Sequence, residues 1–563
     1  MFSHHTTHPH HDLASAPATK KLFERKSFNV QLNSNLMTAI VALYLVLTAN
    51  VSFFSQVASI YPIQTNFAFL VSMIILLFGL MWFVLQLVSF KITVKPVLIV
   101  MVIIASICAY FTDEYGTIFD RSMLINGLQT DQAEARDLLS PLFLLRVTML
   151  GVLPAIVISR VSIKPISLKW SATQKIGGLL LALALMGGSL FAFGNQYASF
   201  FRQHKEVRYY ANPITPLYSS IKLGMDVITD MRRPNTLTEH ATDAKRIIHT
   251  KGGVTSTRKP KLMVFVVGET VRSDHLGLNG YHRNTTPLLS KADDLYSFKN
   301  VTSCGTSTAY SVPCMFSYAD QETYDMDLAK YNENVLDTLQ KQGVNVVWRD
   351  NNSSSKGVAD RVTMQDFKTA EINPVCDVEC RDIGMLDGLD ALVQPKQDTL
   401  IVMHQMGNHG PAYYKRYPKE FEVFKPVCQS SELSKCDNES VINGYDNAIL
   451  YNDFFLNSVI DALKDYEQAY DVMMVYVSDH GESLGENNVY LHGMPYKIAP
   501  KAQKTVPTII WSPKSNHIDN SSFTHQVNNP VSHDYITPTL LNYFDITTQE
   551  VASKPTFFSQ KHD

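Results

Sequence analysis

The sequence predicts an α/β protein in which a transmembrane domain of five helices precedes a soluble domain with a central, mainly parallel sheet. Long apolar runs occur only before residue 200, and the rest of the 563-residue chain has the composition of a soluble domain. Beyond residue 260, short runs rich in β-branched residues alternate with helical candidates, which is typical of a parallel sheet. Lys and Arg (49) nearly balance Asp and Glu (52), which argues against a nucleic-acid-binding protein with a basic surface.

Residues 1–30 are predicted to form a disordered tail on the cytoplasmic side of the membrane. The tail is polar and contains five histidines: His4, His5, His8, His10 and His11. A His-rich tract can bind a metal ion, but a solvated tail is the simpler interpretation.

Residues 31–194 are predicted to form the transmembrane domain, because five apolar runs approach the ~20 residues that cross a bilayer. These runs occupy residues 36–54, 67–90, 96–111, 142–159 and 176–194. The third run is short, and the fourth carries Arg146, whose long side chain can reach the lipid headgroups. No small-residue cleavage pattern follows the first run, so a cleaved signal peptide is not expected.

Basic residues predict the orientation, because loops rich in Lys and Arg stay in the cytoplasm. The N-terminal tail and the loops after the second and fourth runs are basic. Residues 55–66 contain neither Lys nor Arg, and residues 112–141 contain six acidic residues against two Arg. The N-terminus is therefore predicted to be cytoplasmic, and five spans place everything after residue 194 outside the cytoplasm.

The cysteines agree with an exported C-terminal domain. Cys108 lies in the third apolar run, and the other six follow residue 300: Cys304, Cys314, Cys376, Cys380, Cys428 and Cys436. An even number of cysteines in an exported domain predicts disulfides, and six cysteines allow 15 pairings. Pairing of neighbours along the chain is the simplest arrangement, with a zinc or redox role for Cys376 and Cys380 as the alternative.

Residues 195–255 are predicted to connect the two domains. Aromatic and basic residues from Tyr197 to Tyr210 suit an interfacial helix beside lipid headgroups. The alternative is a plain linker, because prolines and glycines follow. Residues 256–563 would then form the soluble domain.

Four buried strands are predicted in the soluble domain, and chemically active residues follow three of them. The strands are predicted at residues 261–267, 344–348, 398–403 and 472–477, with helices at 331–342 and 447–466. Ligands of such sheets bind beyond the carboxyl ends of the strands. The residues found there are Glu269, His404, His409, Asp479 and His480.

Carboxylates clustered with imidazoles are the ligand set of zinc or a similar divalent ion. A small-residue segment at 302–308 adds the hydroxyl of Thr308, which a metal can activate as a nucleophile. Each of these residues alone would be interpreted as a cap or a structural hydrogen-bonding group. Their coincidence at three strand ends predicts phosphoryl or sulfuryl transfer through a covalent intermediate.

These segments resemble the phosphoethanolamine transferases that modify lipid A in Gram-negative bacteria, and especially the mobile colistin-resistance type. The matching segments are residues 268–270, 303–316, 349–352, 404–411, 478–486 and 491–495. They occur in the family's order, and the resemblance extends over residues 30 to 550, the five spans included.

The resemblance implies an alkaline-phosphatase/sulfatase-like fold and one firmly bound zinc ion, with a second during turnover. Glu269, Thr308, Asp479 and His480 would hold the zinc ion, and Thr308 would be the nucleophile. His404, His409 and His492 would line the substrate side, and Lys356 would neutralise phosphate charge. The family's disulfides match the pairing of neighbours, although the Cys376–Cys380 loop is shorter than in the family pattern.

The resemblance also indicates a helix at residues 124–139 within the loop at 112–141. Asn126, Thr130 and Glu134 recur there at every fourth position, which would put them on one face of a helix, and Glu134 could pair with an ethanolammonium group. The alternative for these three residues is the solvated face of a surface helix.

The resemblance implies a monomeric enzyme of the bacterial inner membrane with its catalytic domain in the periplasm. It would transfer phosphoethanolamine from phosphatidylethanolamine to a lipid A phosphate through a phosphoethanolamine–threonine intermediate, which would confer polymyxin resistance. A phosphoglycerol transferase or sulfatase on the same scaffold is an alternative, although residues 314–318 lack the Cys-x-Pro-x-Arg motif of sulfatases. Two further alternatives are an inactive lipid- or metal-sensing protein and a transporter, which would need paired ionisable residues within its spans.

Overall fold

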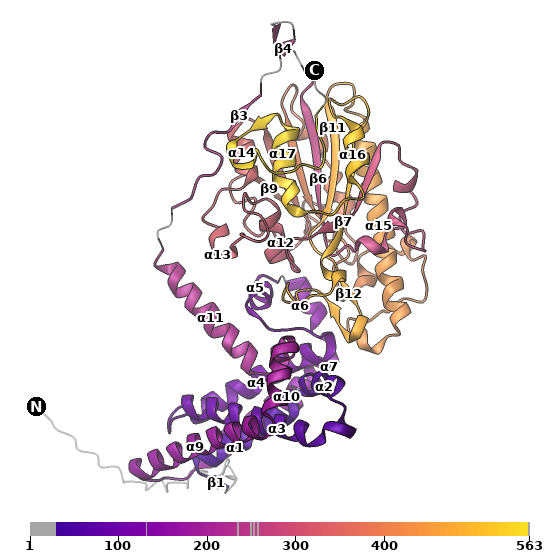
Figure 1. The fold of residues 1–563 in the computed structure, drawn as a ribbon. Coiled ribbons are helices and arrows are strands. Elements are labelled where there is room, and N and C mark those ends of the chain that lie inside the picture. Colours follow the sequence, from indigo (N-terminus) through magenta and orange to yellow (C-terminus); the bar gives the residue numbers. More distant parts are fainter. Residues whose placement is uncertain are drawn as a thin grey trace, which may run out of the picture.

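The computed structural model describes residues 30–130, 132–233, 236–247, 250–251, 254–255 and 258–560. Apart from residue 30, the predicted N-terminal tail lies outside the described residues. The helices up to Met231 form the helical part, and residues 258–560 form the α/β part that lies against it (Figure 1).

The helical part contains the predicted apolar spans. Four of its described helices are long and apolar enough to cross a membrane, or five if one bent pair counts as a single span. The helices are α1 (Ser34–Thr48) with α2 (Val51–Ile60), α3 (Ile63–Val88), α4 (Val94–Tyr115), α7 (Pro141–Val147) continued through a π turn into α8 (Leu153–Arg160), and α9 (Leu168–Ala192). The prediction of five spans agrees with the upper count.

The first predicted span, residues 36–54, is not one straight helix, because the chain bends by 59° between α1 and α2. The bend lies at Asn50, a buried residue whose side-chain amide donates to the carbonyls of Leu45 (3.0 Å) and Asn212 (2.8 Å). The Leu45 carbonyl also accepts from the Ala49 main-chain N–H (3.0 Å), so the Asn50 side chain adds a second bond at the end of α1. Short polar side chains that bond to the main chain in this way favour the end of a helix. Arg146 also differs from the expectation, because its guanidinium pairs with Asp113 (2.6 Å).

The loop between α4 and α7 contains two helices, where the sequence suggested one over residues 124–139. They are α5 (Arg121–Gln129) and α6 (Gln132–Leu138). Thr130 is extended (φ −62°, ψ 132°) and donates its hydroxyl to the Asn126 carbonyl, so the helix ends there. The argument that Asn126, Thr130 and Glu134 share one helical face is therefore wrong, and the Glu134 side chain lies outside the described residues.

The predicted connecting segment begins with two helices, α10 (Gly194–Gln203) and α11 (Ile214–Met231). Tyr197 and Phe200 of α10 are buried against the ring of Phe69 and that of Tyr61, and the Tyr197 hydroxyl lies 3.0 Å from Ser72 Oγ. Tyr197 and Phe200 are thus part of the helical core. This stretch is helical rather than a plain linker, and its place at the membrane interface stays a prediction.

The α/β part is built on an eight-stranded sheet in the order β15-β7-β14-β11-β6-β10-β8-β9. The strands are β6 (Lys261–Gly268), β7 (Leu295–Thr302), β8 (Asn345–Asp350), β9 (Thr363–Asp366), β10 (Thr399–His404), β11 (Asp471–Ser478), β14 (Thr505–Trp511) and β15 (Val531–Ser532). The five strands from β11 to β9 are parallel, and β14 is antiparallel to both of its neighbours. The prediction of a mainly parallel sheet is confirmed.

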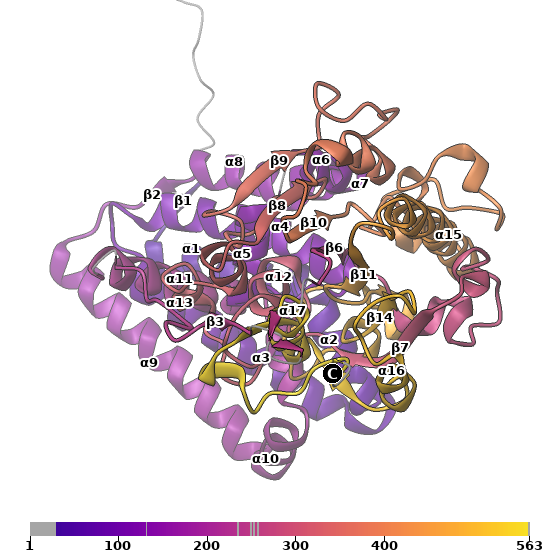
Figure 2. The same cartoon turned by 90° about the horizontal axis from the view of Figure 1, so that it is seen from above.

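Helices cover both faces of this sheet (Figures 1 and 2). On one face, α12 (Thr308–Met315), α14 (Val335–Lys341) and α17 (Ile536–Tyr543) pack on Phe265 and its neighbours. On the other face, α15 (Asn438–Lys464) packs on Val264 and Met474. The remaining described elements are β1 (Gln31–Leu32), β2 (Ser162–Ile163), β3 (Lys245–Arg246), β4 (Thr250–Lys251), β5 (Val254–Thr255), α13 (Met326–Ala329), β12 (Ser483–Leu484), β13 (Tyr490–Leu491), α16 (Asn520–Gln526) and β16 (Ile546–Thr547).

Candidate metal centre and active site

The predicted site residues of the α/β part gather beyond the carboxyl ends of the central strands. Glu269 follows β6, and Asp479 and His480 follow β11, whose last residue pairs with Gly268. Because β6 and β11 are parallel neighbours, their carboxyl ends deliver these side chains to one place. All three residues are fully buried.

Thr308 joins this group from a different segment. It is the first residue of α12, and the Cys304–Cys314 disulfide joins that helix to the loop before it. The Thr308 hydroxyl donates to Glu269 Oε2 (3.1 Å) and lies 3.3 Å from His480 Nε2. The N-terminal end of a helix carries partial positive charge, which stabilises a negatively charged oxygen.

The site residues fit a divalent metal ion. One ligand atom each from Glu269, Asp479 and His480 lies within 4.8 Å of the others. Among the described residues, Glu269 Oε1 and Asp479 Oδ2 have no hydrogen-bond partner although both are buried. Buried carboxylates without partners are strongly unfavourable unless a cation compensates them.

The ionisation of these groups supports the same conclusion. Burial, and then the neighbouring Asp479 carboxylate, raise the pKa of Glu269 well above its usual value. Burial lowers the pKa of His480 to about 4, so its imidazole is neutral at physiological pH. His480 Nδ1 lies 2.9 Å from the Gly481 carbonyl, which places the ring proton on Nδ1 and leaves the Nε2 lone pair for a metal.

A second possible metal group shares Glu269. Its other members are His409 and His492, whose ligand atoms also lie within 4.8 Å of one another and of the Glu269 carboxylate. The His492 Nδ1 atom lies 3.1 Å from Glu482 Oε2, and burial raises the pKa of Glu482 to about 8. Glu482 lies in the matching segment 478–486, but no role is predicted for it from the sequence.

Two further residues support the centre and were not predicted. Asn352 donates its side-chain amide to Glu269 Oε2 (2.9 Å). His533 accepts a hydrogen bond from the Cys304 main-chain N–H (3.1 Å), and its Nε2 lies 3.1 Å from the Ser478 carbonyl. His533 thus connects the loop before Thr308 to the strand before Asp479. Asn352 lies in a segment that carries the family resemblance, whereas no sequence signal distinguishes His533.

An apolar cavity of about 800 Å³ adjoins the site between the two parts of the molecule. Asn126 and Thr130 line it from the helical part, and His409 and His492 line it from the α/β part. Its apolar walls include Phe119, Leu124, Leu139, Phe143, Leu223 and Val227. We call this space the apolar cavity.

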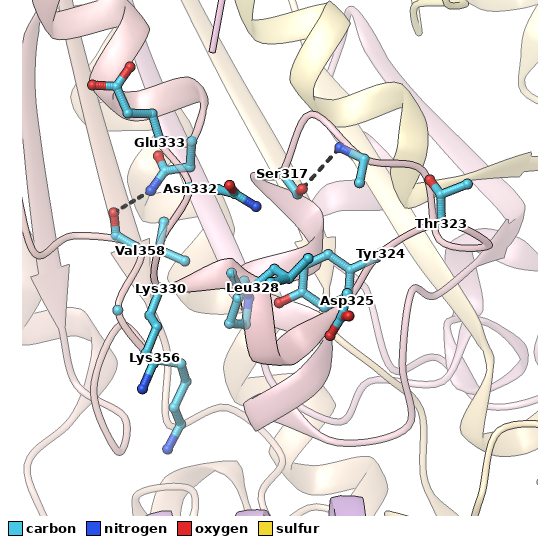
Figure 3. Close-up of a pocket in the computed structure, with 15 residues that line it drawn as sticks. Ser317, Thr323, Tyr324, Asp325, Leu328, Lys330, Asn332, Glu333, Lys356 and Val358 are labelled. Carbon is cyan, nitrogen blue, oxygen red and sulfur yellow. Dashed lines mark hydrogen bonds between the residues drawn. The ribbon is translucent and has the colours of Figure 1, made fainter. Parts of the chain in front are cut away.

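Lys356 and His404, two further predicted site residues, lie outside both candidate metal groups. The Lys356 ammonium donates to Ser353 Oγ (2.7 Å) and to the Gln129 carbonyl (3.4 Å), so it connects the α/β part to α5. Lys356 also borders a polar cavity of about 110 Å³, with Lys330 beside it and Asp325 on the other side (Figure 3). His404 is fully buried, its Nδ1 lies 3.0 Å from Asp350 Oδ2, and its substrate-side role stays a prediction.

The three disulfides form between the neighbouring cysteines: Cys304–Cys314, Cys376–Cys380 and Cys428–Cys436. This is the pairing that the resemblance implied. Cys108 is a free, buried thiol.

Comparison with known proteins identifies the fold and the family. Residues 261–546 match the Sulfatase family, and residues 77–226 match the family described as Phosphoethanolamine transferase EptA/EptB. The structure of the integral membrane lipooligosaccharide phosphoethanolamine transferase A (EptA) from Neisseria meningitidis superposes with a TM-score of 0.86 at 34% identity, covering 92% of this chain and 97% of that one. These matches define the class as a membrane protein that carries a sulfatase-like domain.

Two relatives from Escherichia coli identify the family within that class. The chain is 48% identical to Phosphatidylethanolamine transferase Mcr-2 over 540 residues, covering 94% of this chain and 98% of the relative. It is also 48% identical to Phosphatidylethanolamine transferase Mcr-1 over 532 residues, covering 93% and 97%. The chain belongs to the phosphoethanolamine transferase family.

Proposed function

We propose that this protein transfers phosphoethanolamine from phosphatidylethanolamine to a lipid A phosphate on the periplasmic side of the bacterial inner membrane. The observation that carries the proposal is the position of the Thr308 hydroxyl. It donates to Glu269, a buried carboxylate of the candidate metal group, and this group adjoins the apolar cavity, whose walls suit acyl chains. The basic loops predicted to face the cytoplasm and the disulfides of the α/β part support an orientation in which the catalytic domain lies outside the cytoplasm.

In the first step, Thr308 Oγ1 attacks the phosphorus of phosphatidylethanolamine. The bond from phosphorus to the glycerol oxygen breaks, diacylglycerol leaves with the proton from Thr308, and phosphoethanolamine remains on Thr308. Zinc, held by Glu269, Thr308, Asp479 and His480, would supply the positive charge that makes the hydroxyl a nucleophile. His409 and His492 contact the phosphoryl group from the cavity side, where a second zinc ion would also bind with Glu269.

In the second step, an oxygen of a lipid A phosphate attacks the phosphorus on Thr308. The bond from phosphorus to Thr308 Oγ1 breaks, and the proton of the attacking phosphate monoester passes to Thr308 Oγ1. The product phosphate carries an ethanolammonium cation, which weakens the attraction of cationic polymyxins to the membrane surface. The Thr130 and Asn126 side chains, at the wall of the apolar cavity, lie where they can contact the donor headgroup.

Replacement of Thr308 by Ala tests this proposal. Lipid A from a polymyxin-sensitive host that produces Thr308→Ala should carry no added phosphoethanolamine by mass spectrometry, because the attacking oxygen is absent. Thr306→Ala, which removes a hydroxyl that donates only to the Met494 carbonyl, is the matched control and should retain transfer. Modified lipid A from cells with the Thr308→Ala protein would exclude this residue as the nucleophile.

A further inference from the structure

A second cavity, of about 220 Å³, adjoins the reaction centre on another side. Basic residues line it from two segments: Arg136 from α6, and Lys415 and Arg416 from the loop after β10. His409 and Asn352 line it where it meets the metal centre. We call it the basic cavity.

Helix α6 forms a wall between the two cavities. Ala135, Leu138 and Leu139 line the apolar cavity, whereas Arg136 and Asp137 line the basic cavity. This division follows from helical geometry, since residues three and four apart share one face. A short helix from the helical part thus separates an apolar space from a charged one, and each space contacts His409.

The charges of the basic cavity favour an anion. Its lining contains three cationic side chains against two carboxylates, those of Asp137 and Glu379. Asp137 pairs with Lys415 and with Arg416 (3.2 Å), and Glu379 also pairs with Arg416. The carboxylates therefore hold Arg416 and Lys415 in place, and Arg136 is an exposed guanidinium at the rim.

The basic cavity is coupled directly to the reaction centre. Arg416 is buried, and its Nε donates to the His409 carbonyl (2.6 Å). Asn352, which also lines the cavity, donates to Glu269 Oε2. An anion in the basic cavity would therefore lie beside the residues that hold the transferred group.

We propose that the basic cavity receives the phosphate-bearing sugar of the acceptor, while the apolar cavity receives the acyl chains of the donor. This inference rests on the proposed function. The donor carries a singly charged phosphodiester next to two acyl chains, whereas the acceptor offers a more highly charged phosphate monoester on a polar sugar. Arginine matches phosphate with two parallel hydrogen bonds, so Arg136 at the rim would select the acceptor.

The test measures the two substrates separately with full-length protein in vesicles that contain phosphatidylethanolamine. Arg136→Gln should raise the KM for purified lipid A about tenfold, since it removes one charge-assisted contact, and should change the KM for the donor less than twofold. Arg136→Lys should restore part of the acceptor affinity. Lys419→Gln is the matched control, because Lys419 is an exposed cation that pairs with Glu422 and does not line the cavity.

The outcomes are distinguishable. An equal rise in both KM values would mean that Arg136 acts only through the structure of α6, and an unchanged acceptor KM would mean that the cavity does not bind the acceptor; each result overturns the inference. The intact mass of the wild-type protein, incubated with donor alone, checks the proposed function itself. If no phosphoethanolamine adduct forms on Thr308, that function fails, and the acceptor site fails with it.

Discussion

At the residue scale, the metal centre depends on side chains that fix the orientation of its ligands. Glu269 has one oxygen occupied by hydrogen bonds from Thr308 and Asn352, and its other oxygen has no partner among the described residues. Asn352 therefore sets which carboxylate oxygen faces the metal. Partners of this kind tune metal affinity without binding the metal themselves.

We expect Asn352→Ala to weaken zinc binding by about 10- to 100-fold, because the Glu269 carboxylate loses the donor that orients it. Competition with a fluorescent zinc chelator measures this affinity directly. Asn457→Ala is the control, since Asn457 donates to Asp461 on the outer part of α15. Wild-type zinc affinity in Asn352→Ala would show that the hydrogen bond does not order the ligand.

The strand-end argument locates the metal ligands from sequence but not the residues that support them. Glu269, Asp479 and His480 follow apolar runs that are recognisable without a structure. Asn352 and His533 act through contacts with residues distant in sequence, and His533 stands 229 positions from its partner Cys304. Such contacts arise only once the sheet has brought the loops together.

At the element scale, the four adjacent parallel strands β11, β6, β10 and β8 were predicted, whereas β7, β9, β14 and β15 were not. β6, β10 and β11 are buried along their whole length and appear as continuous apolar runs. β14 contains Pro507, which argues against a central strand, and the sheet accommodates it through a register shift between Val506 and Thr508. β7 is partly exposed and lacks a continuous apolar run.

Helix α12 begins with Thr308, the proposed nucleophile, and the Cys304–Cys314 disulfide closes the segment that contains it. We expect replacement of both cysteines by serine to lower the free energy of unfolding by about 2–4 kcal/mol, since the unfolded chain gains freedom. Thermal unfolding measures the loss. Transfer should also fall, because Thr308 lies within the released loop.

Replacement of Cys376 and Cys380 by serine is the matched control for that pair, because their disulfide closes a segment away from Thr308. This variant should also lose stability, but it should still form the phosphoethanolamine adduct on Thr308 with donor alone, because its loop lines only the basic cavity. Equal losses of adduct formation in the two double variants would contradict a specific role of the Cys304–Cys314 disulfide in holding the nucleophile.

At the scale of the whole molecule, the two parts of the chain complete each other's function. Arg121 of α5 pairs with Asp226 of α11 and with Asp327 of the α/β part, and the Tyr115 hydroxyl donates to the Ser431 carbonyl. Glu114 accepts a hydrogen bond from Ser434 in the Cys428–Cys436 loop. These contacts hold the two walls of the apolar cavity together beside the candidate metal group, so under the proposed function the helical part would help to bind the donor.

This arrangement predicts that recognition of the donor depends on acyl chains and on the helical part. Val227 of α11 lines the apolar cavity at a distance from the metal ligands, and a charge there would be placed against acyl chains. In the full-length protein, Val227→Glu should raise the KM for long-chain phosphatidylethanolamine at least tenfold, at ~0.8 kcal/mol per CH₂ group that loses its apolar contact. Turnover of a water-soluble phosphoethanolamine ester should be unaffected, since that substrate has no chains to bury.

Val423→Glu, at an exposed valine outside the cavity, is the control. If Val227→Glu slows both substrates equally, the cavity does not hold the acyl chains, and α11 serves only to connect the two parts.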